Sequence, residues 1–385
     1  MFATVVAMGI CLPVSRAGEL LPGELPVEWG RELITPQEPP TVSDVIAAVR
    51  EEAPKALAVI RLHADLNNHY APHFSPDGQS LVFLRSDIEG SICKLVTFPR
   101  LSDERATVLY EDFLSYDHMP AWSRGTPTLL AFSSNNADDL QENIHLWTLS
   151  GEPVPLTSQR DSNVLPDLRR TESGTELLYR HEGELREVRF DPAQVVPSNG
   201  ETLGQGTEAS YSPDGAHIAI IRDGGGGHQL FLHDRQTARE SPLSTPSGHY
   251  LRNPVWSPDG QGLACFSRPA SEQSWSLRVL VPKSGEPSAV VVDGVRVQED
   301  FRHLGPSWGP DSRKLWYVST TGEGGYYPLR WTNADGAQSG RVDLPEYLLT
   351  ASDVHCSPSL EQNAVAFVAV ENRSLDVYVA ILNHP

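Results

Sequence analysis

The chain has 385 residues, and its 30 Lys and Arg against 50 Asp and Glu give a formal net charge of −20. Such a negative balance excludes nucleic acid and anionic membrane surfaces as expected partners, because both would repel the chain. Length alone would suggest two or three domains, but internal repeats reduce the expected number.

Residues 1–17 are apolar and end in Ser15-Arg16-Ala17 before Gly18. A short apolar run that ends in a small residue is typical of a secretory signal peptide. The run is too short for a transmembrane helix, which needs about 20 residues, and no later stretch qualifies. We therefore expect a periplasmic or secreted protein without a transmembrane span, whose mature form loses only one charge, that of Arg16.

Residues 18–56 lie between this segment and the first predicted strand. The segment is rich in proline as far as Pro39-Pro40, and it then changes to a helical pattern over Val45–Glu52. Ser43 is placed to cap this helix, and Pro54 would end it. The sequence thus predicts an extended proline-rich segment followed by one short helix.

From residue 57 to residue 385 one phrase recurs, and its full form is Pro-x-aromatic-Ser-Pro-Asp-Gly. Clear copies stand at 72–78, 211–215 and 254–260, and degenerate copies at 120–125, 166–174, 306–311 and 355–359. The position of the aromatic residue, here called the aromatic slot, falls at 74, 122, 168, 211, 256, 308 and 356. A spacing of 43 to 52 residues indicates a solenoid or a propeller.

Each phrase is followed by an apolar run such as Leu81–Leu84 or Ile218–Ile221, and then by a second run such as Gln229–Leu232. About four strands in roughly 40–45 residues is the pattern of a propeller blade. The Pro-Asp-Gly turn fits this interpretation, because Pro fixes φ and Gly accepts a positive φ where the strand re-enters. An all-β fold follows.

These units resemble the TolB-type, WD40-like propeller repeat (PD40) of bacterial periplasmic proteins, over residues 57–385. The resemblance implies a β-propeller, a fold that serves binding proteins and enzymes alike. The strand Leu57–Leu62 precedes the first phrase, and the last repeat is one strand short. We expect this strand to complete a seventh blade and close the ring. A six-bladed ring is the alternative if the weak repeat at 165–179 forms no blade.

The residues three to five places ahead of the aromatic slot are predicted to lie at the rim of the central channel. Many of them are polar: His69, Tyr70, Asp117, His118, Asn163, Glu208, Arg252, His303 and Asp353. These side chains would either cap the strand starts by local hydrogen bonds or form a site for a ligand or peptide. Loops on the same face carry acidic residues and Tyr326 and Tyr327, which are either solvated hairpins or a surface for a basic peptide, a protein or a carbohydrate.

A metal site is a third interpretation of the rim. His69, His118 and His303, with a carboxylate such as Asp353, are ligands that suit Mn, Zn or Fe. This set is similar in outline to that of oligogalacturonate lyases, a propeller family with a related repeat. The resemblance implies a histidine-held manganese in the channel.

Linear catalytic motifs such as Gly-x-Ser-x-Gly and His-Glu-x-x-His are not found in the sequence. The first hypothesis is therefore a monomeric, non-catalytic scaffold of the bacterial envelope, without a cofactor. It would bind a protein, peptide or carbohydrate at its own channel face. The second is a metal-dependent carbohydrate-active enzyme, with Arg252 or Arg302 as a clamp or base.

Overall fold

The structure is a computed structural model. It describes residues 58–62, 68–78, 80–86, 93–98, 107–110, 120–123, 128–135, 142–148, 152–157, 163–171, 174–194, 198–243, 245–282, 289–297, 305–320, 327–342, 344, 348, 351–359, 363–371 and 374–382. The predicted signal peptide, proline-rich segment and helix lie outside these residues, so those three predictions stay untested.

The described strands form seven four-stranded antiparallel sheets. The sheets are numbered here by the position of their innermost strand in the chain, and the strands of each sheet are given from the innermost to the outermost. Sheets 1 to 3 are β2 (Asn68–Phe74), β3 (Leu81–Ser86), β4 (Cys93–Phe98) and β5 (Thr107–Tyr110); β6 (Ala121–Trp122), β7 (Leu130–Asn135), β8 (Glu142–Trp147) and β9 (Val154–Pro155); and β10 (Asn163–Thr171), β11 (Gly174–His181), β12 (Glu184–Phe190) and β13 (Glu201–Gln205). Sheets 4 and 5 are β14 (Glu208–Tyr211), β15 (His217–Asp223), β16 (His228–Asp234) and β17 (Arg239–Pro242); and β18 (His249–Trp256), β19 (Leu263–Pro269), β20 (Trp275–Leu280) and β21 (Ala289–Val295). Sheets 6 and 7 are β22 (Ser307–Trp308), β23 (Lys314–Val318), β24 (Leu329–Asn333) and β25 (Ser339–Arg341); and β26 (Ala351–Cys356), β27 (Ala364–Glu371), β28 (Ser374–Ile381) and β1 (Ala58–Arg61).

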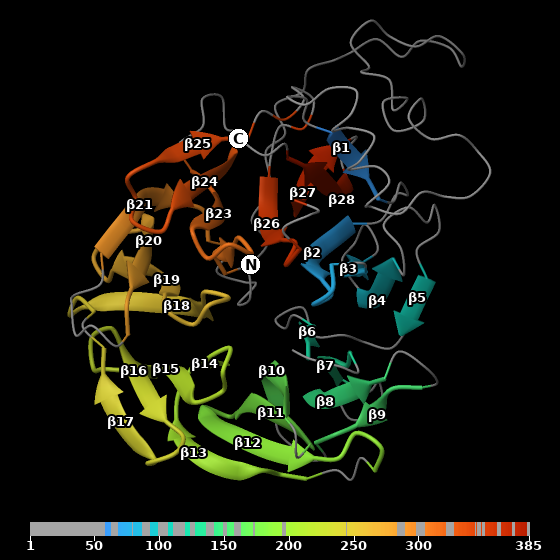
Figure 1. The fold of residues 1–385 in the computed structure, drawn as a ribbon, viewed down its shortest axis with the longest axis vertical. Helices are drawn as coiled ribbons and strands as arrows, with labels where there is room; N and C mark the ends of the chain where they lie inside the picture. The colour runs from blue at the N-terminus through green and yellow to red at the C-terminus, as the bar shows by residue number, and fades with distance from the viewer. Residues whose placement is uncertain are drawn as a thin grey trace, which may run out of the picture.

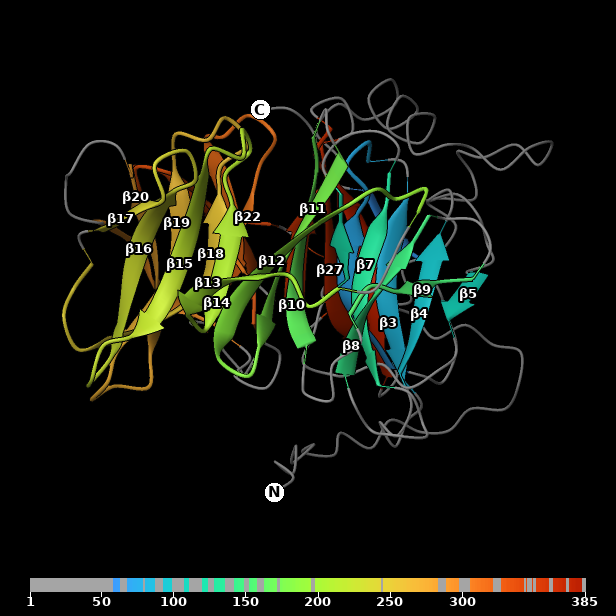
Figure 2. The same cartoon turned by 90° about the horizontal axis from the view of Figure 1, so that it is seen from below.

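The sheets stand around a common axis, with the first strand of each nearest to it (Figure 1). Seen from the side, the strands run between two faces of the ring (Figure 2). The prediction of an all-β propeller is confirmed. We call the face at which the innermost strands begin the top face, and the face at which they end the bottom face.

The Ser-Pro-Asp-Gly phrase forms the tight turn at the bottom face. In sheet 4, the Ser212 hydroxyl donates to the Asp214 carboxylate at 2.6 Å, and the Gly215 amide donates to the Ser212 carbonyl at 2.8 Å. Gly215 has a φ of 66°, which is costly for residues with a Cβ. The same bonds recur in the clear copies of sheets 1 and 5, so the phrase recurs because each inner strand needs this turn.

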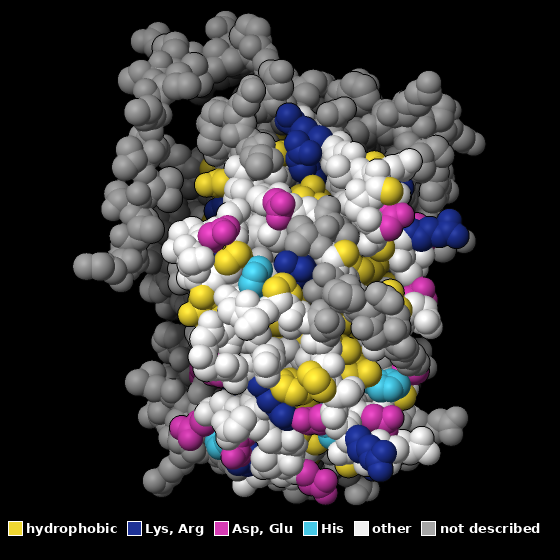
Figure 3. Space-filling model, turned by 90° about the vertical axis from the view of Figure 1, so that its left-hand side faces the viewer, with side chains coloured by type: hydrophobic (Ala, Val, Ile, Leu, Met, Phe, Trp, Pro, Cys, Tyr) yellow, Lys and Arg dark blue, Asp and Glu magenta, His cyan; other side chains and the backbone are white. Residues whose placement is uncertain are grey.

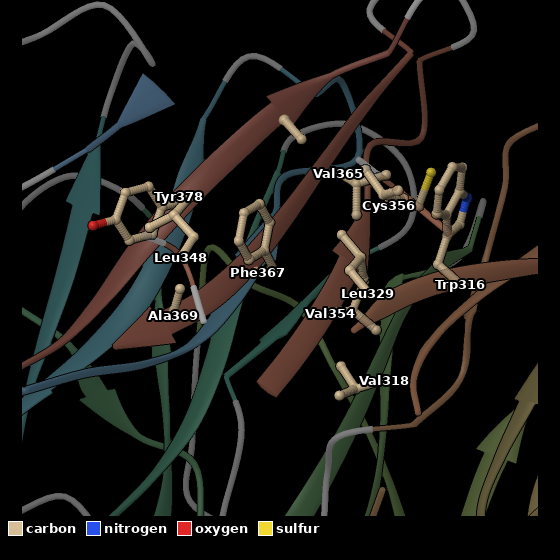
Figure 4. Packing of buried hydrophobic residues seen from close by; sticks show 12 residues of the cluster. Trp316, Val318, Leu329, Leu348, Val354, Cys356, Val365, Phe367, Ala369 and Tyr378 are labelled. Carbon is tan, nitrogen blue, oxygen red and sulfur yellow. The ribbon is translucent and has the colours of Figure 1, made fainter. Parts of the chain in front are cut away.

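The hydrophobic core is divided among the spaces between neighbouring sheets. Between sheets 6 and 7, Trp316 and Leu329 pack against Val354, Phe367 and Tyr378 (Figure 4). Burial of each such side chain stabilises the fold by about 1.5–3 kcal/mol. The weak third repeat also forms a complete sheet, because Leu168 and its neighbours fill the core between sheets 2 and 3.

The N-terminal strand joins the sheet formed by the last three strands of the chain, as the sequence predicts. Strand β1 pairs antiparallel with β28, with Val59 opposite Ala380. The Leu62 amide extends this ladder by donating to the Val377 carbonyl at 3.1 Å. Sheet 7 therefore combines strands from both ends of the propeller.

Candidate functional site

Six of the nine predicted rim residues lie in the described part of the chain, all on the innermost strands near the top face. They are His69, Tyr70, Asn163, Glu208, Arg252 and Asp353. Asp117, His118 and His303 lie outside the described residues, as does Arg302. Whether the nine form one ligand site stays a prediction, but the contacts of the six show what else they do.

A β-bulge places several of these side chains. The pairing register of the innermost strand shifts at the recurring proline in sheets 1, 3 and 5, and at the corresponding Val354 in sheet 7. Ala71, Asn253 and Asp353 occupy this bulge with positive φ values of 56°, 53° and 48°. A bulge bends the strand and re-aims its side chains, so here it turns them toward the neighbouring sheet.

Two rim carboxylates join neighbouring sheets at these bulges. The Ala71 amide donates to Asp353 Oδ2 at 2.9 Å, from sheet 1 to sheet 7. The Asn253 amide donates to Glu208 Oε2 at 2.5 Å, from sheet 5 to sheet 4. Asp353 is 6% exposed and Glu208 is 9% exposed. Each carboxylate thus satisfies a buried backbone amide that the bulge removes from its own ladder.

His69 joins sheet 1 to sheet 7. Its ring is fully buried, with Nδ1 3.0 Å from Asp376 Oδ1, and it meets the edge of Phe83. Asp376 is also fully buried, and its Oδ2 accepts from Arg61 Nη2 at 2.6 Å. Because a buried charge needs such partners, Arg61 and His69 together hold this carboxylate on β28.

Asn163 makes the equivalent contact between sheets 3 and 2. Its Nδ2 donates to Asn143 Oδ1 and to the Glu142 carbonyl, both at 3.2 Å. Its Oδ1 lies 3.1 Å from His181 Nδ1. Asn143 on β8 corresponds to Asp376 on β28, since both belong to the third strand of the preceding sheet. This rim position therefore serves as a bridge between sheets.

Tyr70 and Arg252 are half-buried. Tyr70 packs against the apolar cluster between sheets 1 and 2, which includes Val82 and Trp122. Arg252 pairs with Phe266 across the β18–β19 ladder, directly before the bulge.

Sequence reasoning missed a second set of bridging residues, directly before the aromatic slot. In three sheets this side chain accepts the backbone amide of the aromatic slot in the next sheet. The bonds are Tyr211 N to Asp167 Oδ2 at 2.7 Å, Cys356 N to Ser307 Oγ at 2.8 Å, and Phe74 N to His355 Nδ1 at 3.3 Å. The available signal was the polar residue directly ahead of the aromatic slot, at positions 167, 307 and 355.

The tryptophans of the aromatic slot add a matching bond in the same direction. Trp122 Nε1 donates to the His73 carbonyl at 3.1 Å, and Trp256 and Trp308 donate to carbonyls of the preceding sheet at 3.2 and 2.9 Å. A buried indole needs such a partner. The slot thus selects Trp for its hydrogen bond as well as for its size.

Two histidines face each other where sheets 7 and 1 meet. The ring centroids of His73 and His355 are 3.8 Å apart, with planes inclined by 38°. Burial lowers the pKa of His355 well below its usual value, and the nearby His73 lowers it further. We infer that His355 is neutral at pH 7 and able to accept from the Phe74 amide.

Metal ligands were predicted at His69, His118 and His303, and only His69 can be placed. Within the described residues, no three His, Cys, Asp or Glu side chains are grouped as a metal would require. His69 does have one feature of metal-binding histidines, a carboxylate on one ring nitrogen. The metal site stays a prediction.

No protein-family model matches the chain, and no curated protein matches it. Solved structures do. An oligogalacturonate lyase in complex with manganese aligns with a TM-score of 0.59 and 15% identity, over 86% of this chain and 94% of that one. The oligogalacturonate lyase of Vibrio parahaemolyticus aligns with a TM-score of 0.57 and 14% identity, over 84% and 93%. TolB from Acinetobacter baumannii aligns with a TM-score of 0.48 and 18% identity, over 77% of this chain and 66% of that one.

The chain has a TolB-like β-propeller fold. At these identities the similarities establish the fold and leave the activity open. The chain spans slightly less than two thirds of the length of the TolB structure. Among the described residues, no helix has the length and apolarity needed to cross a membrane.

Proposed function

We propose that the chain is a periplasmic or secreted, monomeric, seven-bladed propeller that binds a protein, peptide or carbohydrate at its top face without catalysis. In this proposal the seven sheets are the blades of one closed ring. The signal-peptide pattern of residues 1–17 supports the location.

The observation that carries the proposal is an aromatic and arginine cluster at the top face of sheet 5. The Arg268 guanidinium lies 5.0 Å from the Tyr250 ring centroid and 5.1 Å from that of Trp275. Tyr250 is 36% exposed, which makes it the most exposed aromatic side chain among the residues whose burial the structure describes. Tyr, Trp and Arg are the residues enriched where proteins bind partners.

The outer side of the ring contrasts with this cluster. On the side that carries β17, β21 and β25, hydrophobic, acidic and basic side chains are interspersed (Figure 3). A mixed surface of this kind is typical of solvated protein surface. The bridging roles of His69, Asn163, Glu208 and Asp353 also favour a scaffold, because these residues hold the ring together.

Site-specific photo-crosslinking would test the proposal. A benzoylphenylalanine in place of Tyr250 lies at the top face, and the same residue in place of exposed Gln261 lies at the bottom face of the same sheet. We expect adducts in the native host at position 250 and none at position 261. Adducts at position 261 alone, or none at position 250, would contradict a top-face recognition surface.

The alternative is a metal-dependent carbohydrate-active enzyme. The alignment over 94% of a manganese-bound oligogalacturonate lyase favours it, as does the carboxylate on His69. A bound metal would neutralise a sugar carboxylate and acidify the adjacent C–H bond, while a residue such as Arg252 held the substrate.

Elemental analysis separates the two functions. Protein purified without a tag or chelator is compared with a His118→Ala, His303→Ala double variant, which leaves the His69–Asp376 bridge intact. Stoichiometric Mn, Zn or Fe that disappears in the double variant, together with lyase activity on uronides, would favour the enzyme. If the protein stays metal-free after dialysis against these ions, the metal-dependent enzyme is ruled out and the non-catalytic scaffold is favoured.

A further inference from the structure

One arginine at the top face differs from the others. Arg296 directly follows β21, and its backbone amide donates to the Val318 carbonyl of sheet 6 at 2.8 Å. Its guanidinium lies 3.8 Å from the ring centroid of Tyr327, two residues ahead of β24. Stacking at this distance fixes the plane of the guanidinium and leaves its N–H edge to hydrogen-bond.

The Arg296 side chain is desolvated without a matching acceptor. Burial lowers the pKa of Arg296, although electrostatic interactions with Tyr327 and Asp353 oppose this effect. Its Nη1 is buried and has no hydrogen-bond acceptor among the described residues. A buried cationic donor in this state is costly, since desolvation is not offset by a bond.

Other arginines with a buried nitrogen have a partner for the guanidinium. Arg61 donates to Asp376, Arg170 to Thr175 Oγ1, and Arg268 to the Glu272 carbonyl. Asp353 affects Arg296 through its charge and not through a hydrogen bond, and its Oδ2 accepts the Ala71 amide. Arg296 therefore presents a positively charged group, fixed in position and with one N–H group lacking an acceptor among the described residues, at the top face of an acidic chain.

We propose that Arg296, stacked on Tyr327, is the binding point for a carboxylate group of the ligand recognised at the top face. The inference rests on the proposed function and names the chemistry of its ligand. A planar guanidinium matches a carboxylate with two parallel hydrogen bonds, and partial desolvation strengthens that pairing. The rest of the acidic surface repels anions, so Arg296 would select where the carboxylate docks.

The test is an NMR titration of protein labelled with ¹⁵N-arginine, at constant ionic strength. Acetate and methyl phosphate are the probes, with chloride as the reference anion. The Arg296 Nε–Hε signal is assigned by its loss in Arg296→Lys. We expect acetate to shift this signal along a saturable curve in the millimolar range, with little effect from chloride.

Two variants sharpen the result, and both are first checked for an unchanged fold by circular dichroism. Asp353→Asn keeps an acceptor for the Ala71 amide and removes a competing charge, so acetate should bind about two- to fivefold more tightly. Tyr327→Leu removes the stacked ring and should weaken acetate binding by about fivefold or more. Equal shifts with acetate and chloride, or no saturation, would overturn the proposal. Tighter binding of methyl phosphate than of acetate would overturn the carboxylate assignment.

This test is independent of the ligand's identity. Loss of the acetate response with crosslinking retained at position 250 would remove Arg296 from the recognition surface and keep the surface itself. The reverse result would keep the anion site and contradict the proposed function.

Discussion

Two seams of the ring make the same backbone bond with different chemistry. In the arginine seam, between sheets 3 and 4, Asp167 accepts the Tyr211 amide. In the closure seam, between sheets 7 and 1, His355 accepts the Phe74 amide from the equivalent position. A carboxylate accepts best when charged, whereas an imidazole accepts only when neutral. The two seams should therefore respond differently to charge and to pH.

The arginine seam concentrates charge around Glu176, whose side chain is 3% exposed. Arg169, Arg189 and Arg235 lie 3.0, 2.5 and 3.0 Å from its carboxylate oxygens. Burial alone would raise the pKa of Glu176, but hydrogen bonds from Arg235 and Arg189 and the charges of Arg235 and Arg169 outweigh it, so the pKa is lowered. The carboxylate thus stays ionised in the folded protein.

Tyr211 lies at the centre of the same seam. Arg169 and Arg235 lie over its ring, 5.6 and 5.3 Å from the centroid, and its hydroxyl donates to Glu187 at 2.6 Å. Burial and Glu187 raise the pKa of Tyr211 well above its usual value. Tyr211 therefore stays a neutral donor over the whole pH range in which the seam is intact.

The largest expected effect is that of Glu176→Gln. The change removes the carboxylate shared by three guanidinium groups, two of which are largely buried. We expect the free energy of unfolding to fall by about 3 kcal/mol at pH 7, measured by urea denaturation. Glu184→Gln is the control, because the side chain of Glu184 is 36% exposed and pairs with Arg186, and it should cost less than about 1 kcal/mol. Equal losses in both variants would contradict a central role for Glu176.

Asp376→Asn tests the closure seam. Asn can still accept from Arg61 and His69, but the charge that Arg61 neutralises is gone. We expect a loss of about 2 kcal/mol, because Arg61 is partly exposed and regains some hydration.

The double variant His69→Asn, Asp376→Asn copies the Asn163–Asn143 pair that joins sheets 3 and 2. It should be no less stable than Asp376→Asn alone, since two amides can bond to each other. A further loss in the double variant, measured by the same urea denaturation, would contradict the equivalence of the two bridges.

Two glycines at the same position of the turn separate backbone strain from the arginine seam. A Cβ at Gly215 would lie 1.7 Å from the Arg169 guanidinium carbon, whereas at Gly260 the nearest atom is Pro213 Cδ at 3.5 Å. Both have a positive φ, so each change to Ala costs about 1 kcal/mol from the backbone alone. Gly215→Ala should cost about 1 kcal/mol more than Gly260→Ala. Equal thermal stabilities of the two variants would show that Arg169 moves aside freely.

The smallest effect is a pH dependence of the closure seam. The pKa of His355 is lower in the folded protein than its ordinary 6.5, so only the unfolded chain binds a proton there as pH falls. The contribution of the neutral His355 ring to the free energy of unfolding is therefore complete above pH 6.5. It decreases below that pH by at most about 1.4 kcal/mol per pH unit. His355→Asn keeps an acceptor that does not titrate, and it should flatten the fall in melting temperature between pH 6.5 and 5.

Glu176 is an acid rather than a base, and it affects stability in a lower pH range than His355 does. Its lowered pKa means that its contribution is complete above its ordinary 4.5 and is lost only below that pH. The melting temperature of Glu176→Gln should therefore run parallel to that of the parent protein between pH 6.5 and 5. A steeper or shallower slope over this range would show that the two seams are not independent.

The turns and strands could be predicted because their determinants are local. Ser212, Asp214 and Gly215 lie within four residues, and they fix the same turn wherever they recur. The third repeat was harder to recognise because Leu168 fills the aromatic slot. Its sheet forms nevertheless, since packing of Leu168 and Tyr179 against sheet 2 needs apolar volume rather than a particular phrase.

The bridges of the rim could not be predicted, because their partners are far apart in sequence. Asn163 and Glu208 were recognised as polar residues near the top face, but their acceptors and donors lie 20 and 45 residues away. His69 and Asp376 are separated by 307 residues. Nothing local indicates such pairs, so a polar residue that joins two sheets has the same appearance in the sequence as one that binds a ligand.

The pairing of β1 with β28 also has a consequence for biosynthesis, because the two strands are made at different times. The ribosome makes the first strand of the ring long before β28, its only neighbour in the sheet, and the 307 residues between His69 and Asp376 take about 15–60 s to synthesise. Throughout this interval β1 has an unpaired edge and Arg61 has no Asp376. The nascent chain must therefore keep β1 from pairing elsewhere until the last sheet emerges.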